Sequence, residues 1–283
     1  MSSPTTFLIA GGTGRQGGSV VNALLADKST SIQAKDIYVL TRNTAGAGAA
    51  ALATRGVKLV QGELGQPDAI FKQLSDLGVN PTKTAAFLSQ AHGPTELNDA
   101  KGFIDAAITN GLSYFVYSSC DRGGPELSDR DASYCKTFSD KFGTSNQLAQ
   151  VARTSTTQFC DQLGWRENMG GKRMQVTTIK DIGRWATEAL LRPDASGIRN
   201  SALSIASDYL SFDELDAIFQ KETGKPVSVT YGWLARLMIW MVEDLRTMFG
   251  WINERDYDAN LEELAKTVKP TTFREWVKEA HKA

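Results

Sequence analysis

The segment that most constrains this chain is the glycine-rich run Gly11–Gly17 (GGTGRQG), which lies between the apolar run Thr6–Ala10 and a helix-like stretch. Its glycines have the spacing of a dinucleotide-binding turn. They permit the tight turn, let the backbone approach a pyrophosphate, and allow close helix–strand packing. A turn without a ligand can have the same composition, but the strand–turn–helix context favours cofactor binding at the helix N-terminus. The residues predicted to contact the cofactor here are Gly11, Gly12, Thr13, Gly14, Arg15, Gln16 and Gly17.

Short apolar runs alternate with helix-like stretches through the first half of the chain. Apolar runs without period-two alternation are typical of strands buried on both faces, and strands alternating with helices indicate a parallel sheet with right-handed crossovers. The sequence therefore predicts an α/β protein, with a Rossmann-type doubly wound parallel sheet and a smaller C-terminal α/β substrate region. The expected strands are Thr6–Ala10, Asp36–Thr41, Lys58–Gln61, Thr84–Leu88 and Tyr114–Ser118, and the expected helices are 19–26, 47–55, 68–77 and 96–110.

The second half of the chain is less regular. We expect an NAD(P)-binding domain over 1–142, an atypical segment over 143–164, and a C-terminal substrate or partner region over 165–283 that is intertwined with the first domain. A single amphipathic helix is expected over 233–251, forming either core or the apolar wall of a substrate pocket. The other expected elements are strands over 174–178, 203–206 and 227–230, a helix over 181–191, and a helix capped by Ser211.

Composition excludes several kinds of partner. The net charge is −1, so no basic excess suggests a nucleic-acid partner. Three cysteines without CxxC spacing and two histidines argue against a disulfide framework or a metal site. The sequence has no uncharged apolar run of about 18 residues, so no membrane span is expected. The simplest compartment is the cytoplasm.

The end of the second expected strand indicates which cofactor is bound. NAD-specific sites commonly place an acidic residue there to bind the ribose 2′-hydroxyl. This chain has Thr41-Arg42-Asn43 instead. The guanidinium of Arg42 suits a 2′-phosphate, and no carboxylate stands in its place. The alternative is a solvated surface arginine; we favour NADP(H).

Six motifs together resemble the fungal members of the NmrA-like family of atypical short-chain dehydrogenase/reductase proteins. The resemblance covers most of the chain, and the family fold is the one expected above. The motifs are Ile9–Gly17 (IAGGTGRQG), Leu40–Asn43 (LTRN), Gly62-Glu63-Leu64, Tyr114–Gly123 (YFVYSSCDRG), Lys180–Trp185 (KDIGRW) and the tail from Thr223 to Trp276.

The resemblance implies further site residues. Glu63 and Leu64 match the family's turn beside the adenine, Lys141 matches the family lysine, and Ser89 and Gln90 stand at the end of the fourth strand, over the expected cofactor. The segment 143–164 departs from the family, since it lacks the Leu-Arg-Pro that ends the family's sixth strand. We interpret this as a missing sixth strand and pocket wall, from alternative splicing or an inaccurate gene model.

The sequence leaves catalysis open. None of Tyr114, Tyr117 and Tyr134 has a lysine four residues on, so the usual Tyr-x-x-x-Lys acid is missing. Lys141 is the catalytic candidate by resemblance and could also hold the nicotinamide ribose, with a surface lysine as the alternative. Ser118 could bind a substrate carbonyl, although ordinary strand-end polarity explains it slightly better.

Two further residues near the expected site have ordinary explanations. Cys120 could be a redox-sensitive thiol, but an unreactive thiol is the simpler explanation. His92 could contact cofactor or ligand, and an ordinary loop histidine is the alternative.

The sequence therefore predicts an NADP(H)-binding oxidoreductase acting on a small organic substrate in fungal secondary metabolism. The alternative is a non-catalytic redox sensor that binds a regulatory protein partner, as NmrA itself is understood to do. Such a sensor could also enter the nucleus.

Overall fold

The computed structural model describes residues 3–90, 93–120, 149–153, 165–169, 171–228, 231–254 and 257–282. The chain divides into two compact units. Unit 1 comprises Met1–Ser119, Gly143–Val151 and Ile182–Leu203, and unit 2 comprises Cys120–Phe142, Ala152–Asp181 and Ser204–Ala283. None of the described helices combines the length and apolarity needed to cross a membrane.

A seven-stranded sheet has the strand order β3-β2-β1-β4-β5-β6-β8. The pairings among its first five strands are all parallel. The chain runs from β1 outward to β3 and then returns to the other side of β1, which is the doubly wound arrangement predicted from the sequence. The strands are β1 (Thr6–Ala10), β2 (Ile37–Thr41), β3 (Lys58–Gln61), β4 (Thr84–Leu88), β5 (Tyr114–Cys120), β6 (Ala149–Arg153) and β8 (Ala202–Ile205).

Helices connect these strands close to where the sequence predicts them. The largest difference is at α1, which begins at Arg15 and not at residue 19, so the last glycine of the turn, Gly17, lies inside the first turn of the helix. Short 3-10 helices at Ala34–Asp36 and Pro81–Lys83 lead into β2 and β4. The α-helices are α1 (Arg15–Ala26), α2 (Ala47–Thr54), α3 (Pro67–Asp76), α4 (Glu96–Thr109) and α8 (Ile179–Leu191).

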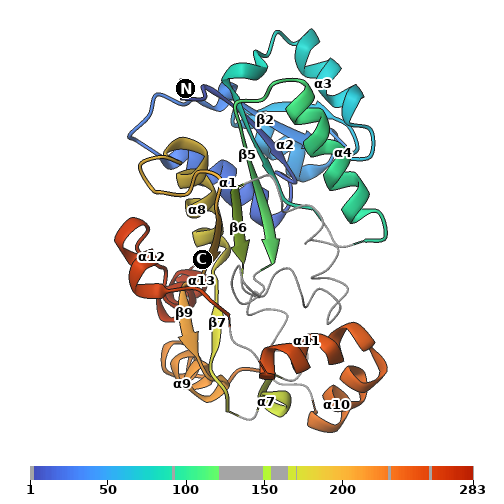
Figure 1. Ribbon diagram of the computed structural model, residues 1–283. Coiled ribbons are helices and arrows are strands. Elements are labelled where there is room, and N and C mark those ends of the chain that lie inside the picture. The colour runs from blue at the N-terminus through green and yellow to red at the C-terminus, as the bar shows by residue number, and fades with distance from the viewer. Residues whose placement is uncertain are drawn as a thin grey trace. The chain divides into compact units, whose positions relative to one another are not determined.

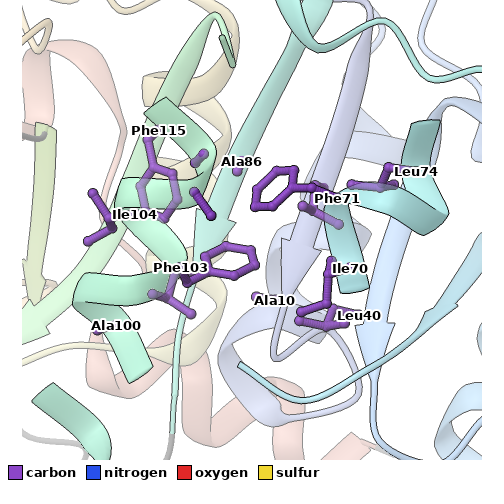
Figure 2. Close-up of a cluster of buried hydrophobic side chains, with 14 of the residues drawn as sticks. Ala10, Leu40, Ile70, Phe71, Leu74, Ala86, Ala100, Phe103, Ile104 and Phe115 are labelled. Atoms are coloured by element: carbon purple, nitrogen blue, oxygen red, sulfur yellow. The ribbon is translucent and has the colours of Figure 1, made fainter. Parts of the chain in front are cut away.

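Helices α3 and α4 cover one face of the sheet (Figure 1). Phe71 of α3 and Phe103 of α4 meet with ring centroids 5.5 Å apart, and Phe103 meets Phe115 of β5 edge-on at 6.0 Å (Figure 2). Phe103 is fully buried, and burying an aromatic side chain contributes about 2–3 kcal/mol. The opposite face is covered by α1, whose Val20, Val21 and Leu24 are fully buried.

Helix α8 approaches α1 closely within unit 1. A Cβ on Gly183 would lie 2.3 Å from Ser19 Oγ and 2.5 Å from the Ser19 carbonyl oxygen. Only glycine fits this contact, which explains the glycine of the segment Lys180–Trp185 in packing terms.

The predicted loss of a sixth strand is wrong. Strand β6 (Ala149–Arg153) lies between β5 and β8 in the sheet order. Its sequence AQVAR has little hydrophobic signal. A strand flanked on both sides is held by backbone hydrogen bonds, which do not depend on side-chain type.

Unit 2 contains a two-stranded antiparallel sheet of β7 (Met174–Val176) and β9 (Asp208–Leu210). Strand β9 was not expected from the sequence, because a three-residue strand is too short to show a periodicity. The helices of this unit are α7 (Trp165–Asn168), α9 (Phe212–Thr223), α10 (Gly232–Met241), α11 (Glu243–Glu254), α12 (Leu261–Thr267) and α13 (Phe273–Lys282).

The predicted cap of α9 is confirmed. The Glu214 N–H donates to Ser211 Oγ, and the Ser211 N–H donates to the Glu214 carboxylate, forming a capping box. Gly224 ends the helix in the left-handed conformation. The strand expected over 227–230 is wrong for 227 and 228, because the Val227 N–H donates to Asp216 Oδ1 at 2.7 Å and not to a sheet. Residues 229 and 230 lie outside the described residues.

The single helix predicted over 233–251 is in fact two helices, α10 and α11, separated at Val242. The Arg246 guanidinium donates to the Trp240 carbonyl oxygen at 3.1 Å, which satisfies an orphan carbonyl at the end of α10. The core interpretation holds for α11, where Phe249, Trp251 and Ile252 are buried.

The apolar residues of α10 are mostly exposed. Trp233, Leu237, Trp240 and Met241 follow the spacing of one helix face, and their exposed fractions are 69%, 41%, 69% and 69%. Ile239 is 7% exposed and packs in the core of unit 2. The core prediction is therefore wrong for this face, and the pocket-wall alternative stays a prediction.

One charged network of unit 1 permits a stability prediction. Arg192 Nη2 donates to Asp27 Oδ2 at 2.8 Å and to Glu188 Oε2 at 2.6 Å. Both carboxylate side chains are largely buried, at 12% and 15% exposed. Replacing Arg192 with methionine should lower the free energy of unfolding at pH 7 by about 1–3 kcal/mol, since it leaves two buried carboxylates unpaired.

The effect should depend on pH. Burial raises the pKa of Asp27, but hydrogen bonds from Ser29 and Arg192 outweigh it and hold that pKa below 3.8. The network's stabilisation is therefore present above pH 3.8 and is lost as the pH falls through the lowered value. Urea titrations at pH 7 and at pH 3 should show the Arg192→Met deficit shrinking in acid. Lys72→Met breaks an exposed pair with Asp76 and is the matched control, expected to change little. An equal deficit at both pH values would refute the account.

Candidate functional site

The sequence-predicted residues of unit 1 gather at the carboxyl ends of its parallel strands. Because the sheet order is β3-β2-β1-β4-β5, the chain segments that follow these strands stand in one row. Open α/β sheets bind ligands along this edge, at the point where the strand order reverses. In row order, the segments carry Glu63 and Leu64, then Arg42, then the glycine-rich turn, then Ser89 and Gln90; Ser118 lies within the last residues of β5 itself.

Close contacts within the glycine-rich turn leave no room for a Cβ atom at Gly11, Gly12 or Gly17. The Gly14 N–H donates to the Gly11 carbonyl oxygen at 2.9 Å, and Gly11 has a φ of +83°. A Cβ on Gly17 would lie 2.3 Å from that carbonyl oxygen, and one on Gly12 would lie 2.7 Å from Val39 Cγ1. Contacts below 3.0 Å force a shift, so these positions require glycine. The structure thus forms the turn that the glycine spacing predicts.

The N-terminus of α1 suits an anion. Its N-cap is Gly14, which provides no side-chain cap, and the first turn of α1 carries no acidic residue. Thr13, Gly14 and Arg15 are exposed. An uncapped helix N-terminus with exposed flanking residues matches a pyrophosphate site. The residues present therefore fit the phosphates of a dinucleotide.

The loop after β2 holds Arg42 in an ordered setting. The Asn43 N–H donates to Thr41 Oγ1 at 3.3 Å, and the Ala45 N–H donates to Asn43 Oδ1 at 2.9 Å. Gln61 Nε2 also donates to the Arg42 carbonyl oxygen at 3.4 Å. The backbone of Arg42 is thus fixed while its side chain is exposed. This arrangement leaves the guanidinium able to meet a 2′-phosphate.

The turn after β3 continues the sheet edge. The Gly62 N–H donates to the Thr41 carbonyl oxygen at 3.0 Å. Glu63 is exposed, while Leu64 is partly buried against the core beneath α3 and α4. Leu64 therefore offers an apolar surface beside the β2 loop, and Glu63 offers its carboxylate to solvent.

Beyond the switch point, three side chains meet. Ser89 Oγ donates to Gln16 Oε1 at 3.0 Å, and Ser118 Oγ donates to the same oxygen at 2.8 Å. Gln90 Nε2 donates to the Glu96 carbonyl oxygen at 2.5 Å, which ties the loop after β4 to the start of α4. The structure thus joins the glycine-rich turn, the end of β4 and the end of β5.

The other catalytic candidates are not placed by the structure. Lys141 and His92 lie outside the described residues, as does Tyr134, and the side chain of Cys120 is not described. The roles assigned to Lys141 and to Ser118 stay predictions.

The tyrosines of β5 are poor proton donors. Burial raises the pKa of Tyr114 to about 12, against the opposing effect of the Arg199 guanidinium, which lies 5.1 Å from the ring centroid. Tyr117 is fully buried in the core. A catalytic acid works best with a pKa near the operating pH, so Tyr114 does not suit that role. Tyr117 has no exposed surface through which to reach a substrate.

Sequence reasoning missed two contributors. The first is Asn43, whose Oδ1 accepts the Ala45 N–H and thereby forms an Asx turn that orders the Arg42 loop. An asparagine between a strand end and Gly46 is a turn signal that could have suggested this role. The contact of Gln16 with the two serines had no local signal, because the partners are 73 and 102 residues away.

The fold and the strand-end row together define an α/β dinucleotide-binding protein. The chain matches the sequence profile of the NmrA-like family over residues 3–160 and 126–277. The chain belongs to the NmrA-like family, which confirms the resemblance stated above.

The related proteins of known sequence are named as oxidoreductases. The NmrA-like family domain-containing oxidoreductase lnbB from Aspergillus flavus is 23% identical over 249 residues, which cover 76% of this chain and 72% of that protein. The corresponding oxidoreductase FrzB from Cladobotryum sp is 32% identical over 119 residues, covering 40% of this chain and 34% of that protein.

Solved structures share the fold over nearly the whole chain. The triphenylmethane reductase of Citrobacter sp complexed with NADP(H) has a TM-score of 0.72 at 20% identity, covering 97% of this chain and 99% of that one. NmrA, a negative transcriptional regulator in complex with NADP, has a TM-score of 0.67 at 13% identity, covering 98% and 95%. At these identities the likeness establishes the fold alone.

Proposed function

We propose that this chain is an NADP(H)-binding oxidoreductase that acts on a small organic substrate. The observation that carries the proposal is the glycine-rich turn, whose backbone contacts exclude side chains, beside an ordered and exposed Arg42. The names of the related oxidoreductases and the NADP(H) held by structural neighbours support it. The chemistry that NADP(H) supplies when bound is hydride transfer.

Each group of residues has a role in this proposal. The turn Gly11–Gly17 holds the pyrophosphate at the N-terminus of α1, and Arg42 pairs with the 2′-phosphate. Glu63 and Leu64 border the adenine, while Ser89, Gln90 and Ser118 border the other half of the cofactor. Lys141 acts as proton donor or holds the nicotinamide ribose.

The proposal assigns an NAD(P)-binding domain to 1–142 and a substrate region to 165–283. The exposed apolar face of α10 (Trp233, Leu237, Trp240 and Met241) is suited to an apolar substrate, since pockets for small molecules are lined mainly by hydrophobic and aromatic side chains. We place the protein in fungal secondary metabolism and in the cytoplasm.

The second candidate function is a redox sensor that binds a regulatory protein and can enter the nucleus. It is favoured by the absence of a Tyr-x-x-x-Lys motif from the sequence and by the fold shared with the regulator NmrA. A sensor needs the cofactor site but no proton donor.

One experiment separates the two functions. A screen of carbonyl and quinone compounds for NADPH oxidation should run beside a partner pull-down with NADP⁺ and with NADPH. Turnover of any compound without redox-dependent capture supports the oxidoreductase. Capture that depends on the redox state, with no turnover, supports the sensor and contradicts the oxidoreductase.

A cofactor prediction follows from Arg42. Arg42→Ala should weaken NADPH binding about ten- to a hundredfold and leave NADH binding nearly unchanged, because a charge-assisted contact to a phosphate contributes about 1.5–3 kcal/mol. Isothermal titration with both cofactors measures this. Arg55→Ala removes another exposed arginine of unit 1, which donates to Asn22, and should leave both affinities intact. Equal losses for NADPH and NADH in Arg42→Ala would count against the 2′-phosphate role.

A further inference from the structure

The side chain of Gln16 joins three elements of unit 1. Gln16 lies in the first turn of α1, and its Oε1 accepts a hydrogen bond from Ser89, just after β4, and one from Ser118, on β5. The donor–acceptor distances are 3.0 and 2.8 Å, which are normal for hydroxyl donors. One amide oxygen therefore holds the ends of two neighbouring strands to the glycine-rich turn.

The burial of these three side chains increases the cost of losing their hydrogen bonds. Ser118 is 3% exposed, and Ser89 and Gln16 are half-buried. Water replaces a hydrogen bond poorly in such a setting, so loss of one partner costs more than loss of an exposed contact. Each hydroxyl has a single proton, and both protons are directed at Gln16. These two hydrogen bonds thus hold both serine hydroxyls in position.

A second contact joins the glycine-rich turn to the residue that follows β4. A Cβ on Gly11 would lie 2.2 Å from the Ser89 carbonyl oxygen, so the backbone of the turn touches the backbone after β4. Gly11 fixes the main chain at the switch point, and Gln16 fixes the two hydroxyls beside it. The backbone contact between Gly11 and Ser89 stabilises the turn itself. The hydrogen bonds of Gln16 extend to β5, which lies on the other side of β1 from the β2 loop that carries Arg42.

We propose that Gln16 is a positioning residue for the nicotinamide half of the cofactor, acting through Ser89 and Ser118. The inference rests on the proposed function. A dinucleotide lies across the switch point, so with its 2′-phosphate at Arg42 on the β2 side, its other half lies over β4 and β5. Gln16 then sets the polar surface that this half meets, separately from phosphate binding by the turn.

This inference changes the role of Ser118. Polarising a substrate carbonyl requires a hydrogen-bond donor, and the Ser118 proton is directed at Gln16. We therefore expect Ser118 to help position the cofactor and not to donate to a substrate carbonyl.

The test compares two ligands that differ in the nicotinamide half. Gln16→Leu should weaken NADP⁺ binding about tenfold, the effect of losing roughly 1.4 kcal/mol. Adenosine 2′,5′-bisphosphate carries the 2′-phosphate and no nicotinamide, so its affinity should stay within twofold. Gln66→Leu is the matched control, because Gln66 is exposed and its side chain caps nothing. It should leave both affinities unchanged.

A double variant removes the same two hydrogen bonds by deleting the serine donors in place of the Gln16 acceptor. The pair Ser89→Ala and Ser118→Ala should weaken NADP⁺ binding about as much as Gln16→Leu. Adding Gln16→Leu to the pair should cost less than a further twofold, since coupled residues are not additive. This pair also tests the inference if Gln16→Leu fails to fold.

The outcomes are distinguishable. Equal losses for both ligands in Gln16→Leu would mean general damage to the turn and would overturn the inference, as would unchanged NADP⁺ affinity or additive losses. In these cases the unaltered chain still binds NADP⁺, and the proposed function stands. A folded unaltered chain that binds neither ligand would overturn the proposed function, and this inference with it.

Discussion

Gly17→Ala should weaken NADP(H) binding by about a hundredfold or more. The new Cβ would lie 2.3 Å from the Gly11 carbonyl oxygen and 2.7 Å from the Gly12 nitrogen, both backbone atoms. That carbonyl oxygen also accepts the Gly14 N–H that closes the turn. The methyl group must therefore open the turn or push α1 away from β1, and either shift misplaces the N–H groups that face the phosphates.

The measurement is a cofactor titration of the folded variant, with its unfolding free energy determined alongside. Overpacking of this kind costs about 1–3 kcal/mol of stability. Gly102→Ala is the control: its Cβ would meet nothing within 4 Å, and it lies inside α4. Gly102→Ala should keep full affinity and gain up to about 1 kcal/mol. Wild-type affinity in Gly17→Ala would contradict the description of the turn as the phosphate site.

Lys141→Ala should reduce turnover by roughly 10²–10⁴ while cofactor affinity stays within a few-fold, because a positioned proton donor contributes a factor of that size. The prediction rests on the family resemblance at Lys141 and on the exclusion of Tyr114, whose pKa is raised by burial to about 12. With no suitable tyrosine on β5, another group must supply the proton.

Steady-state kinetics on the best compound from the screen would test this. Lys101→Ala removes an exposed lysine of α4 and should leave turnover unchanged. Unchanged turnover in Lys141→Ala would show that Lys141 is an ordinary surface lysine.

The elements of unit 1 were predictable because their signals are local. Strands β1, β3 and β4 have the predicted bounds. Strands β1 and β4 are buried along almost their whole length, and strands buried on both faces read as continuous apolar runs. The turn was predictable because glycine spacing reports backbone geometry directly. The same reasoning did not extend to β6, whose weakly hydrophobic sequence AQVAR forms a strand between two neighbours.

The parts that could not be predicted depend on contacts distant in sequence. The break between α10 and α11 and the exposure of Trp233 and Trp240 are not visible in a periodicity that runs through both helices. Likewise, nothing local to Gln16 indicates that its side chain meets Ser89 and Ser118. The sequence therefore predicted which residues lie along the strand-end row, and the structure supplied the hydrogen bonds of Gln16 with Ser89 and Ser118.

The most direct test of the account is a titration of the unaltered chain with NADPH and with NADH under identical conditions. The account predicts that NADPH binds at least about tenfold more tightly, because Arg42 meets a 2′-phosphate that NADH lacks. Equal affinities, or tighter binding of NADH, would contradict the NADP(H) assignment.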